Sequence, residues 1–231
     1  MSASIRVLST KKLQSNQKQY LLNAGFAVID ADFISIEPLP FSVEASSYDM
    51  LIFSSQNAVE QVLCIQEEIK DKAVLCVGEK TKKMLVEHGF TVVAQALSAE
   101  ELIGCIEDKY FANRFIFFCG KQKLDTIPHF LKTKKIQHTL VEVYETHTNS
   151  LTILSKADVL LFFSPSGVKS FLKNNKITDE TCFCIGQTTA KALEHLTNKI
   201  IIASQPSVEN VIVQVINYLG CQASKGQNGN A

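Results

Sequence analysis

Short apolar runs alternate along the chain with amphipathic stretches and with turns rich in Ser, Thr, Gly and Asn. Apolar runs bounded by turn residues are typical of buried strands, and apolar positions that recur every three or four residues are typical of helices covering a sheet. This alternation predicts an α/β fold of parallel sheets with helices on both faces. The expected strands are 5–9, 27–32, 50–54, 73–77, 90–94, 115–119, 138–143, 158–163, 182–186 and 199–203, and the expected helices are 15–24, 57–68, 80–88, 99–107, 125–134, 167–173, 188–196 and 208–219.

A sequence repeat relates the two halves of the chain. Three segments of the first half recur in the second half at an offset of about 110 residues, and such self-similarity indicates a duplicated structural unit. We therefore expect two similar domains. The matching pairs are 53–59 (FSSQNAV) with 163–168 (FSPSGV), 77–85 (VGEKTKKML) with 185–193 (IGQTTAKAL), and 5–11 (IRVLSTK) with 116–122 (IFFCGKQ).

Two segments interrupt the alternation at corresponding places in the two halves, and prolines keep the first of them extended. If both segments are linkers, the middle of the chain forms one domain and the two ends together form the other. A single ten-stranded sheet is the alternative that the pattern leaves open. The expected organisation is a discontinuous first domain (1–36 plus 148–220), a second domain (41–142), two interdomain linkers (37–40 and 143–147) and a disordered tail (221–231).

The charge and hydropathy of the chain limit its partners. Its 231 residues contain 23 Lys and Arg against 23 Asp and Glu, so no overall basic field exists to hold a phosphate backbone. Uninterrupted apolar runs such as 159–163 are far shorter than the roughly 18 residues of a membrane helix. The segment 1–6 has no apolar signal region. We therefore expect a cytoplasmic protein that binds neither nucleic acid nor a membrane.

Sequence motifs for a metal or a nucleotide cofactor are missing. The seven cysteines are an odd number and mostly lie in apolar runs, which is typical of small buried side chains in a reducing compartment. The five histidines are scattered, and Cys182 and Cys184 have no complementary pair, so no metal-ligand spacing results. No G-x-G-x-x-G, complete P-loop or G-x-S-x-G motif is present. We expect no cofactor, no metal and no serine hydrolase.

Six strand-to-helix turns carry small, hydroxyl or amide groups: 9–12, 54–57, 78–81, 120–123, 164–167 and 186–189. In an open parallel sheet, ligands bind beyond the carboxyl ends of the strands, where helix starts present free N–H groups. Hydroxyls and backbone amides bind carboxylates or phosphates, so the turns favour a small anionic ligand. Ordinary helix capping is the alternative for any one turn. The expected binding residues are Ser54, Ser55, Asn57, Thr81, Lys121, Ser164, Ser166, Gly167, Thr188 and Thr189.

Thr188 and Thr189 follow Gly186 at an expected helix start, so their hydroxyls have two possible uses. We expect one of them to cap the helix and the other to bind a substrate carboxylate.

Three motifs in order resemble the uroporphyrinogen-III synthase family. They are Tyr144 in 141–146 (VEVYET), then 162–168 (FFSPSGV), then 184–193 (CIGQTTAKAL). The segments FSSQNAV and VGEKT upstream are similar to that family as well, and the resemblance spans about residues 5–219. The chain departs from the family in two places: Lys11 and Lys12 stand where an Arg-Pro is frequent, and Lys121 and Lys123 stand where an arginine is common. Lysine supplies charge but not a bidentate fork.

The resemblance implies an enzyme that closes linear hydroxymethylbilane into uroporphyrinogen III, with inversion of ring D and loss of water, without cofactor or metal. It also implies two α/β domains that are joined by a pair of linkers and face each other across a cleft. The substrate carries carboxylates on every ring, which accounts for turns rich in hydroxyls and amides. The further expectations are a monomer and a transient hand-off of substrate from hydroxymethylbilane synthase.

The implied chemistry begins when hydroxide leaves the substrate and an electrophilic azafulvene forms. Tyr144 is the expected catalytic residue, because a phenol can donate a hydrogen bond to the departing oxygen. A packing role at the domain junction is the alternative for this tyrosine. Two other function classes stay open: a two-domain small-anion-binding or sensor module without turnover, and a glycosyl- or phosphoryl-transferring enzyme, which the lack of carboxylate pairs and phosphate loops disfavours.

Overall fold

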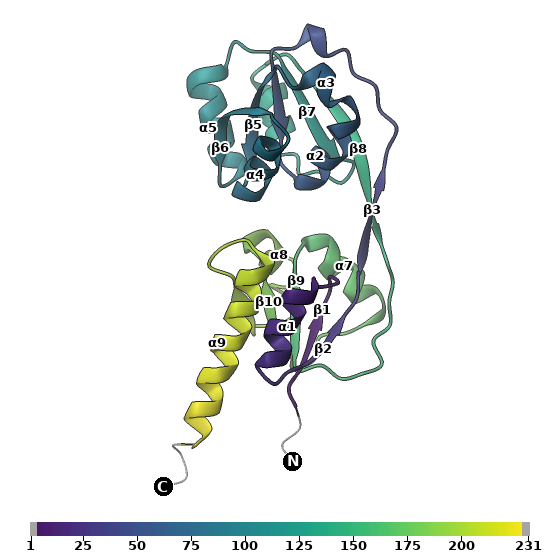
Figure 1. Ribbon diagram of the computed structural model, residues 1–231, viewed down its shortest axis with the longest axis vertical. Helices are drawn as coiled ribbons and strands as arrows, with labels where there is room; N and C mark the ends of the chain where they lie inside the picture. The colour runs from purple at the N-terminus through teal and green to yellow at the C-terminus, as the bar shows by residue number, and fades with distance from the viewer. Residues whose placement is uncertain (1–3, 228–231) are drawn as a thin grey trace. The chain divides into compact units, whose positions relative to one another are not determined.

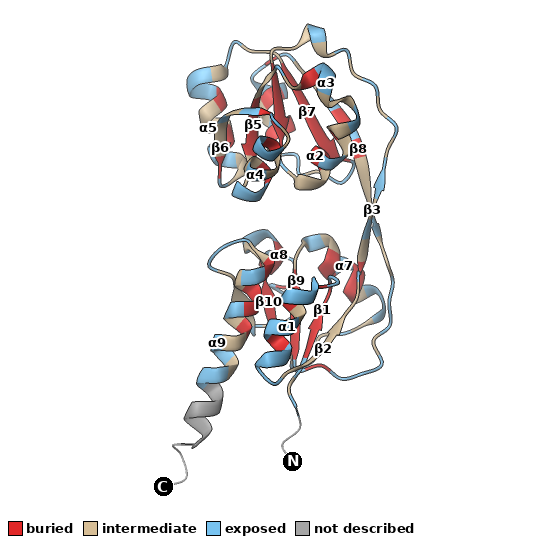
Figure 2. Ribbon diagram, in the orientation of Figure 1, coloured by how far each residue is buried: buried red, intermediate tan, exposed pale blue. Residues whose placement is uncertain are grey.

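The computed structural model describes residues 4–227, with side chains up to residue 221, and divides into two compact units. Unit 1 contains the chain up to Ser35 and from His147 onward, and unit 2 contains Ile36–Thr146. The strands in the middle of both sheets are mostly buried, and the edge strands are partly exposed, as Figure 2 shows. Each unit therefore has a core of its own.

Unit 1 is a five-stranded parallel sheet in the order β11-β10-β9-β1-β2 (Figure 1). Helices α1 and α9 cover one face, where they pack Leu21 and Val211 against Val7, Leu161 and Phe183. Helices α7 and α8 cover the other. The strands are β1 (Arg6–Ser9), β2 (Ala27–Asp30), β9 (Val159–Phe162), β10 (Thr181–Cys184) and β11 (Ile200–Ile202), and the helices are α1 (Ser15–Asn23), α7 (Pro165–Asn174), α8 (Gln187–Lys191) and α9 (Val208–Gln227).

Unit 2 is a six-stranded sheet in the order β3-β8-β7-β4-β5-β6 (Figure 1). Helices α2, α3 and α4 cover one face, and α5 and α6 cover the other. The strands are β3 (Ile34–Pro38), β4 (Met50–Phe53), β5 (Ala73–Val77), β6 (Thr91–Ala96), β7 (Phe115–Gly120) and β8 (His138–Thr148). The helices are α2 (Gln56–Val62), α3 (Gln66–Ile69), α4 (Glu79–Glu87), α5 (Ala99–Cys105) and α6 (Thr126–Thr133), with 3₁₀ turns at Ala45–Ser47 and Leu63–Ile65 and a short π-helix at Ile106–Tyr110.

The α/β class with two mostly parallel sheets flanked by helices is therefore confirmed. The sequence repeat is also visible in the topology: β4 corresponds to β9, β5 to β10 and β7 to β1. Apart from β3, corresponding strands have the same spatial order in the two sheets. They differ in their order along the chain, because unit 1 begins with β1, whereas its counterpart β7 follows β4, β5 and β6 in unit 2. The strand order reverses between β4 and β7 in unit 2 and between β1 and β9 in unit 1. We call these two places the switch points, because ligands bind there in open α/β sheets.

The segments 37–40 and 143–147, expected as linkers, lie at or within paired strands. The chain crosses from unit to unit at Ser35–Ile36 in β3 and at Thr146–His147 in β8, and these two strands are neighbours. Leu39 N donates to Val143 O at 3.0 Å, and Asn149 N donates to Phe33 O at 2.8 Å. Positions rise on one strand as they fall on the other, so the pair is antiparallel. Pro38 is tolerated because β3 is an edge strand.

Three expected helices differ clearly from the structure. The stretch 57–68 is broken by the 3₁₀ turn Leu63–Ile65, and the helix expected at 188–196 ends at Lys191. Helix α9 continues to Gln227, within the segment where a disordered tail was expected, and residues 228–231 lie outside the described residues. A glycine inside a helix costs only about 1 kcal/mol relative to alanine, and no proline follows Gly220 to end the helix.

Candidate functional site

The two switch points bring polar residues together at the carboxyl ends of adjacent strands. In unit 2, Phe53 of β4 pairs with Phe118 of β7, and Ser55 and Gly120 each lie two residues beyond that pair. In unit 1, the turn that starts at Ser164 follows β9, and Thr10 follows the adjacent strand β1. Each unit therefore carries one candidate surface, formed by the turns 54–57 and 120–123 in unit 2 and by the turns 9–12 and 164–167 in unit 1.

Two of the expected serines cap helices. Ser55 Oγ accepts a hydrogen bond from Asn57 N at 3.2 Å, and Ser164 Oγ accepts one from Gly167 N at 3.0 Å. The capping alternative is therefore correct for these two oxygens, although each hydroxyl still has a proton to donate. Ser54 is exposed and is not a cap residue.

The start of α7 packs closely on the end of β1. A Cβ on Gly167 would lie 3.4 Å from Ser164 Oγ and 3.5 Å from Thr10 Oγ1. Thr10 is only 3% exposed, and its Oγ1 donates to Leu161 O at 2.7 Å. Both distances are ordinary van der Waals contacts, so Gly167 lies beside Thr10 at the unit 1 switch point, and its N–H is already used by the cap. Ser166 remains half-buried beside it.

The glycine turns before α4 and α8 place equivalent threonines differently from the expectation. Thr81 and Thr189 are each the third residue of their helix and are 5% and 1% exposed, whereas Thr188 is exposed. The N-cap of α8 is Gly186, and no side chain caps it. The expectation that Thr188 or Thr189 caps this helix is therefore wrong. A side-chain cap acts from the residue before the first helical residue, and both threonines lie inside the helix.

Lys121 and Lys123 are both paired within unit 2. Lys121 Nζ lies 3.0 Å from Glu145 Oε2, and Lys123 Nζ lies 2.7 Å from Glu142 Oε1. The hydrogen bond from Lys123 to Glu142 raises the pKa of Lys123. Lys123 is the more enclosed side chain, at 16% exposed against 54% for Lys121. Only Lys121 is open enough to reach a ligand while it remains paired.

Tyr144 lies against the end of β7. Between Cys119 and Gly120 the register of β7 with β8 shifts by one residue, so Cys119 pairs with Glu142 and Gly120 pairs with Tyr144. A Cβ on Gly120 would lie 2.6 Å from Tyr144 Cζ and 2.9 Å from its hydroxyl oxygen. The Tyr144 ring is half-buried against the α2 side of the sheet. Its hydroxyl has no hydrogen-bond partner among the residues that the structure describes.

Gly120 and Thr10 were not expected as site residues. Thr10 lies in a turn that the sequence singled out, but its side chain binds the neighbouring strand rather than its own helix. Gly120 ends a strand, and a glycine at such a place is a signal for close approach of another group.

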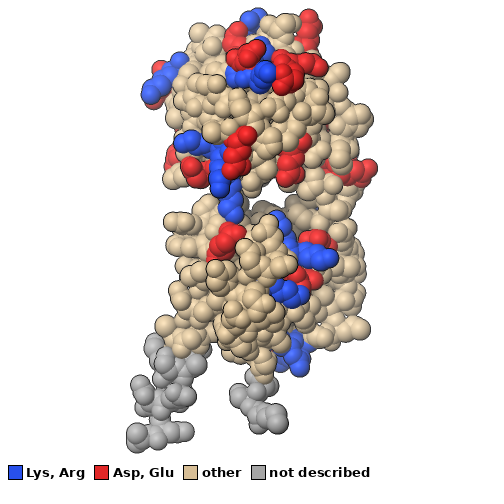
Figure 3. Space-filling model, in the orientation of Figure 1, with Lys and Arg blue, Asp and Glu red and all other residues tan. Residues whose placement is uncertain are grey.

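The described side chains include no group of three or more His, Cys, Asp or Glu that could hold a metal ion. Burial raises the pKa of the Cys76 and Cys119 thiols to about 11 and that of Cys182 and Cys184 to about 12. These four thiols are protonated core side chains. Acidic and basic side chains are interspersed on the face shown in Figure 3. None of the described helices is both long enough and apolar enough to span a membrane.

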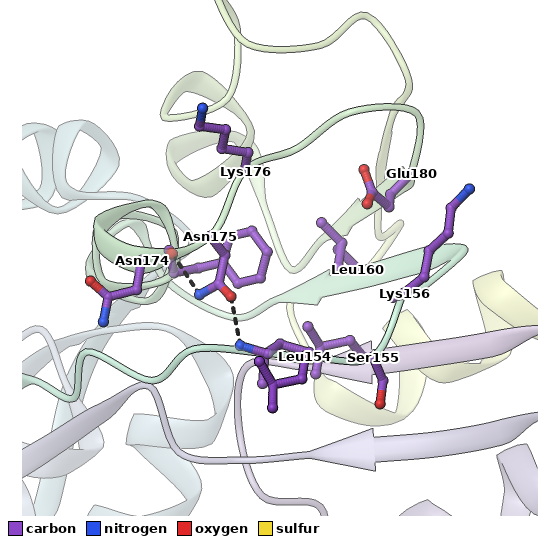
Figure 4. Close-up of a pocket in the computed structure, with 12 residues that line it drawn as sticks. Leu154, Ser155, Lys156, Leu160, Asn174, Asn175, Lys176 and Glu180 are labelled. Atoms are coloured by element: carbon purple, nitrogen blue, oxygen red, sulfur yellow. Dashed lines mark hydrogen bonds between the residues drawn. The ribbon is translucent and has the colours of Figure 1, made fainter.

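Unit 1 also contains a hollow of about 340 Å³ at the opposite, amino ends of its strands (Figure 4). Lys156 and Ala157 precede β9 there, and Glu180 precedes β10. Its polar groups are engaged internally: Asn175 accepts from Ile153 N at 2.8 Å, and Glu180 accepts from Thr178 N at 2.6 Å. This hollow is remote from the switch points and is not the candidate site.

Comparisons with known proteins agree with this arrangement. Residues 15–212 match the family model described as "Uroporphyrinogen-III synthase HemD". The uroporphyrinogen-III synthetase structure from Helicobacter pylori is 21% identical, with a TM-score of 0.69 over 94% of this chain and all of that one. A mutant synthase from Thermus thermophilus is 14% identical, with a TM-score of 0.68 over 93% of this chain and 98% of that one. The structures support the fold, and because the family model covers most of the sequence, the chain belongs to the uroporphyrinogen-III synthase family, the enzymes that cyclise hydroxymethylbilane in heme biosynthesis.

Proposed function

We propose that this chain performs the family's cyclisation with Tyr144 as the hydrogen-bond donor to the departing oxygen, and with the switch-point turns as carboxylate-binding groups. The observation that carries the proposal is the Tyr144 hydroxyl, which lies at the carboxyl end of β7 and has no hydrogen-bond partner among the described residues. A half-buried phenol whose O–H has no acceptor among the described residues can donate a hydrogen bond to a ligand.

The substrate supplies the driving force for the first step. The pyrrole nitrogen pushes electrons toward the hydroxymethyl carbon, the C–O bond breaks, and the Tyr144 hydroxyl stabilises the departing oxygen by a hydrogen bond. The oxygen leaves as water together with the pyrrole N–H proton. The substituted carbon of ring D then attacks the azafulvene and forms a spiro intermediate that fragments and recloses. Holding the substrate in that geometry can lower the activation free energy by about 7–11 kcal/mol.

The turns supply hydroxyl, amide and ammonium donors for the carboxylates of the substrate. Ser54 and Thr188 are exposed, and Lys121 is about half-exposed beside Glu145. Ser55, Asn57, Ser164 and Ser166 lie at the starts of α2 and α7, where the helix dipole favours an anion. Buried Thr81, Thr189 and Gly167 act by holding the turns in place.

Product isomer analysis with purified protein tests this function. Hydroxymethylbilane closes spontaneously to the type I isomer, so formation of type III reports enzymatic turnover. We expect type III from the wild type, and a loss of at most about 10²–10³ in kcat for Tyr144→Phe, the effect of removing one donor. Binding of hydroxymethylbilane without type III product would instead establish the sensor-module alternative, which the family match does not favour.

We further propose a monomer that acts in the cytoplasm and receives its substrate directly from hydroxymethylbilane synthase. The support for the cytoplasm is the set of buried cysteine thiols, which is typical of a reducing compartment. The support for the hand-off is a substrate that is lost by spontaneous closure. Sedimentation velocity tests the monomer, and fractionation of cells tests the location. A coupled assay with a trap for free hydroxymethylbilane tests the hand-off, because a trap that abolishes type III formation would exclude it.

A further inference from the structure

We propose that Gly120 and the bulge of β8 at Val143 together position the Tyr144 phenol. Gly120 is then a positioning residue for the cyclisation, because it leaves the space that the ring occupies. This inference rests on the proposed role of Tyr144 for its catalytic consequence, but its structural part stands independently.

The bulge decides on which face of the sheet Tyr144 lies. Val141 and Val143 point to the core on the α2 side, so regular alternation would send residue 144 to the face of Glu142. Because the pairing skips Val143, Tyr144 packs on the same side as the two valines. A bulge places two successive side chains on one face, and bulges commonly aim a side chain at a functional site.

Gly120 decides how close the ring can lie to β7. A Cβ at this position would be 2.6 Å from Tyr144 Cζ and 2.7 Å from Cε2, closer than side chains approach one another. Only Gly25, Gly78 and Gly89 have left-handed φ among the described glycines, so Gly120 is not required for its backbone angle. The demand at this position is for space. Any other residue must displace the ring.

The backbone on both sides of Tyr144 is held in place. Lys121 N donates to Tyr144 O at 2.9 Å, and Thr146 N donates to Gln122 Oε1 at 3.0 Å. On the other edge of β8, Val143 O accepts from Leu39 N at 3.0 Å. With these bonds formed, the position of the phenol depends on the side-chain torsions alone. The contact with Gly120 restricts them.

The hydroxyl is thereby held at the unit 2 switch point. Its oxygen lies beside the Gly120 backbone, at the carboxyl end of β7. The adjacent strand, β4, leads into Ser54 and Ser55. Movement of a donor by about 1 Å can lower a rate by a factor of about 10². A substitution at Gly120 should therefore affect the reaction although Gly120 itself need not contact the substrate.

Fluorine NMR of protein labelled with 3-fluorotyrosine reports the ring position directly. The chain has five tyrosines and no tryptophan, and the Tyr144 resonance is identified by its loss in Tyr144→Phe. We expect Gly120→Ala to shift this resonance and to lower kcat by about 10–10³-fold, with a smaller change in KM. Gly104→Ala is the matched control, because a Cβ at Gly104 meets nothing within 4 Å. It should leave both the resonance and kcat unchanged.

A second pair of variants protects the test against simple misfolding. In a Tyr144→Ala background the space beside Gly120 is empty, so adding Gly120→Ala should change neither the denaturation midpoint nor the residual kcat. Equal losses from Gly120→Ala in both backgrounds would overturn the inference. An unshifted Tyr144 resonance in Gly120→Ala would overturn it as well.

The combined readouts separate this inference from the proposed function. If Gly120→Ala shifts the resonance while both Gly120→Ala and Tyr144→Phe keep full type III synthesis, the catalytic role of Tyr144 is wrong. If Tyr144→Phe loses activity but Gly120→Ala keeps it with a shifted resonance, the positioning role of Gly120 is wrong.

Discussion

Thr81 of unit 2 and Thr189 of unit 1 occupy the same position in the repeat: each is the third residue of a helix that starts directly after a glycine. They are 5% and 1% exposed, so both side chains are enclosed. A Cβ on Gly78 would lie 3.8 Å from Thr81 Oγ1, which places this hydroxyl under the turn. The two buried threonines therefore support the turns from the protein interior, whereas the preceding residues, Lys80 and Thr188, are exposed to solvent.

Alanine substitutions at 188 and 189 should separate stability from binding. Thr189→Ala removes a buried methyl and hydroxyl, and we expect it to lower the free energy of unfolding by roughly 0.5–3 kcal/mol. Thr188→Ala alters an exposed residue, so stability should stay within about 0.5 kcal/mol while KM rises. Urea denaturation and type III kinetics on both variants check this. Full kinetic activity of Thr188→Ala would show that the turn does not bind substrate.

Removing the serine caps should destabilise their helices. Ser164→Ala leaves Gly167 N without its acceptor, and we expect a loss of about 0.5–2 kcal/mol in the free energy of unfolding. Ser55→Ala should have a similar effect through Asn57 N. Ser54→Ala is the matched control, because Ser54 is exposed and caps no helix. Equal urea midpoints for Ser55→Ala and Ser54→Ala would contradict the capping assignment.

Lys121 and Lys123 should respond differently to neutralisation. The Lys121 side chain is 54% exposed, and Glu145 also accepts a hydrogen bond from Gln122 Nε2 at 3.1 Å, so Lys121→Gln should leave the urea midpoint nearly unchanged and raise KM. Lys123 is mostly enclosed and Lys123→Gln removes the partner of Glu142, so its larger effect should be on stability. If Lys121→Gln leaves KM unchanged, this lysine does not bind a carboxylate.

The strands were the most predictable part of the fold. Buried strands in a parallel sheet are continuous apolar runs, so 159–162 stands out in the sequence within one residue of its expected bounds. Strand β3 was missed because Pro38 and Pro40 indicate a chain outside a sheet, and only the edge position beside β8 makes the pairing possible. Edge position is a property of the tertiary structure and leaves no local signal.

The site was predictable only where its interactions are local. The Ser164 cap joins residues three apart and follows from the sequence pattern. The pairing of Lys121 with Glu145 spans 24 residues and depends on the register of β7 with β8. Alternation places Tyr144 on the face of Glu142, and the bulge that reverses this is visible only in the strand pairing. The contact with Gly120 could not be predicted from the sequence for the same reason.

The loss of stability below pH 4 should depend in part on Asp49, which links the amino ends of β4 and β7. Asp49 precedes β4 and Arg114 precedes β7, and the guanidinium binds the carboxylate through Nε at 3.0 Å and Nη2 at 2.7 Å. These bonds, with one from Arg114 N, lower the pKa of Asp49 from 3.8 to about 2. A carboxyl group whose pKa is lower in the folded state stabilises the fold above its unfolded pKa. The contribution is therefore complete above pH 4 and is lost as the pH falls toward 2.

Asp49→Asn should accordingly have a lower urea midpoint than the wild type at neutral pH, and the difference should shrink between about pH 4 and pH 2. The matched control is Asp179→Asn, since Asp179 pairs with Lys199 at the surface of unit 1 and its side chain is 85% exposed. Its midpoint should follow the wild type more closely at every pH, because exposed ion pairs contribute little. A difference between Asp49→Asn and the wild type that stays constant from pH 7 to pH 2 would show that Asp49 acts through packing and hydrogen bonds rather than through its charge.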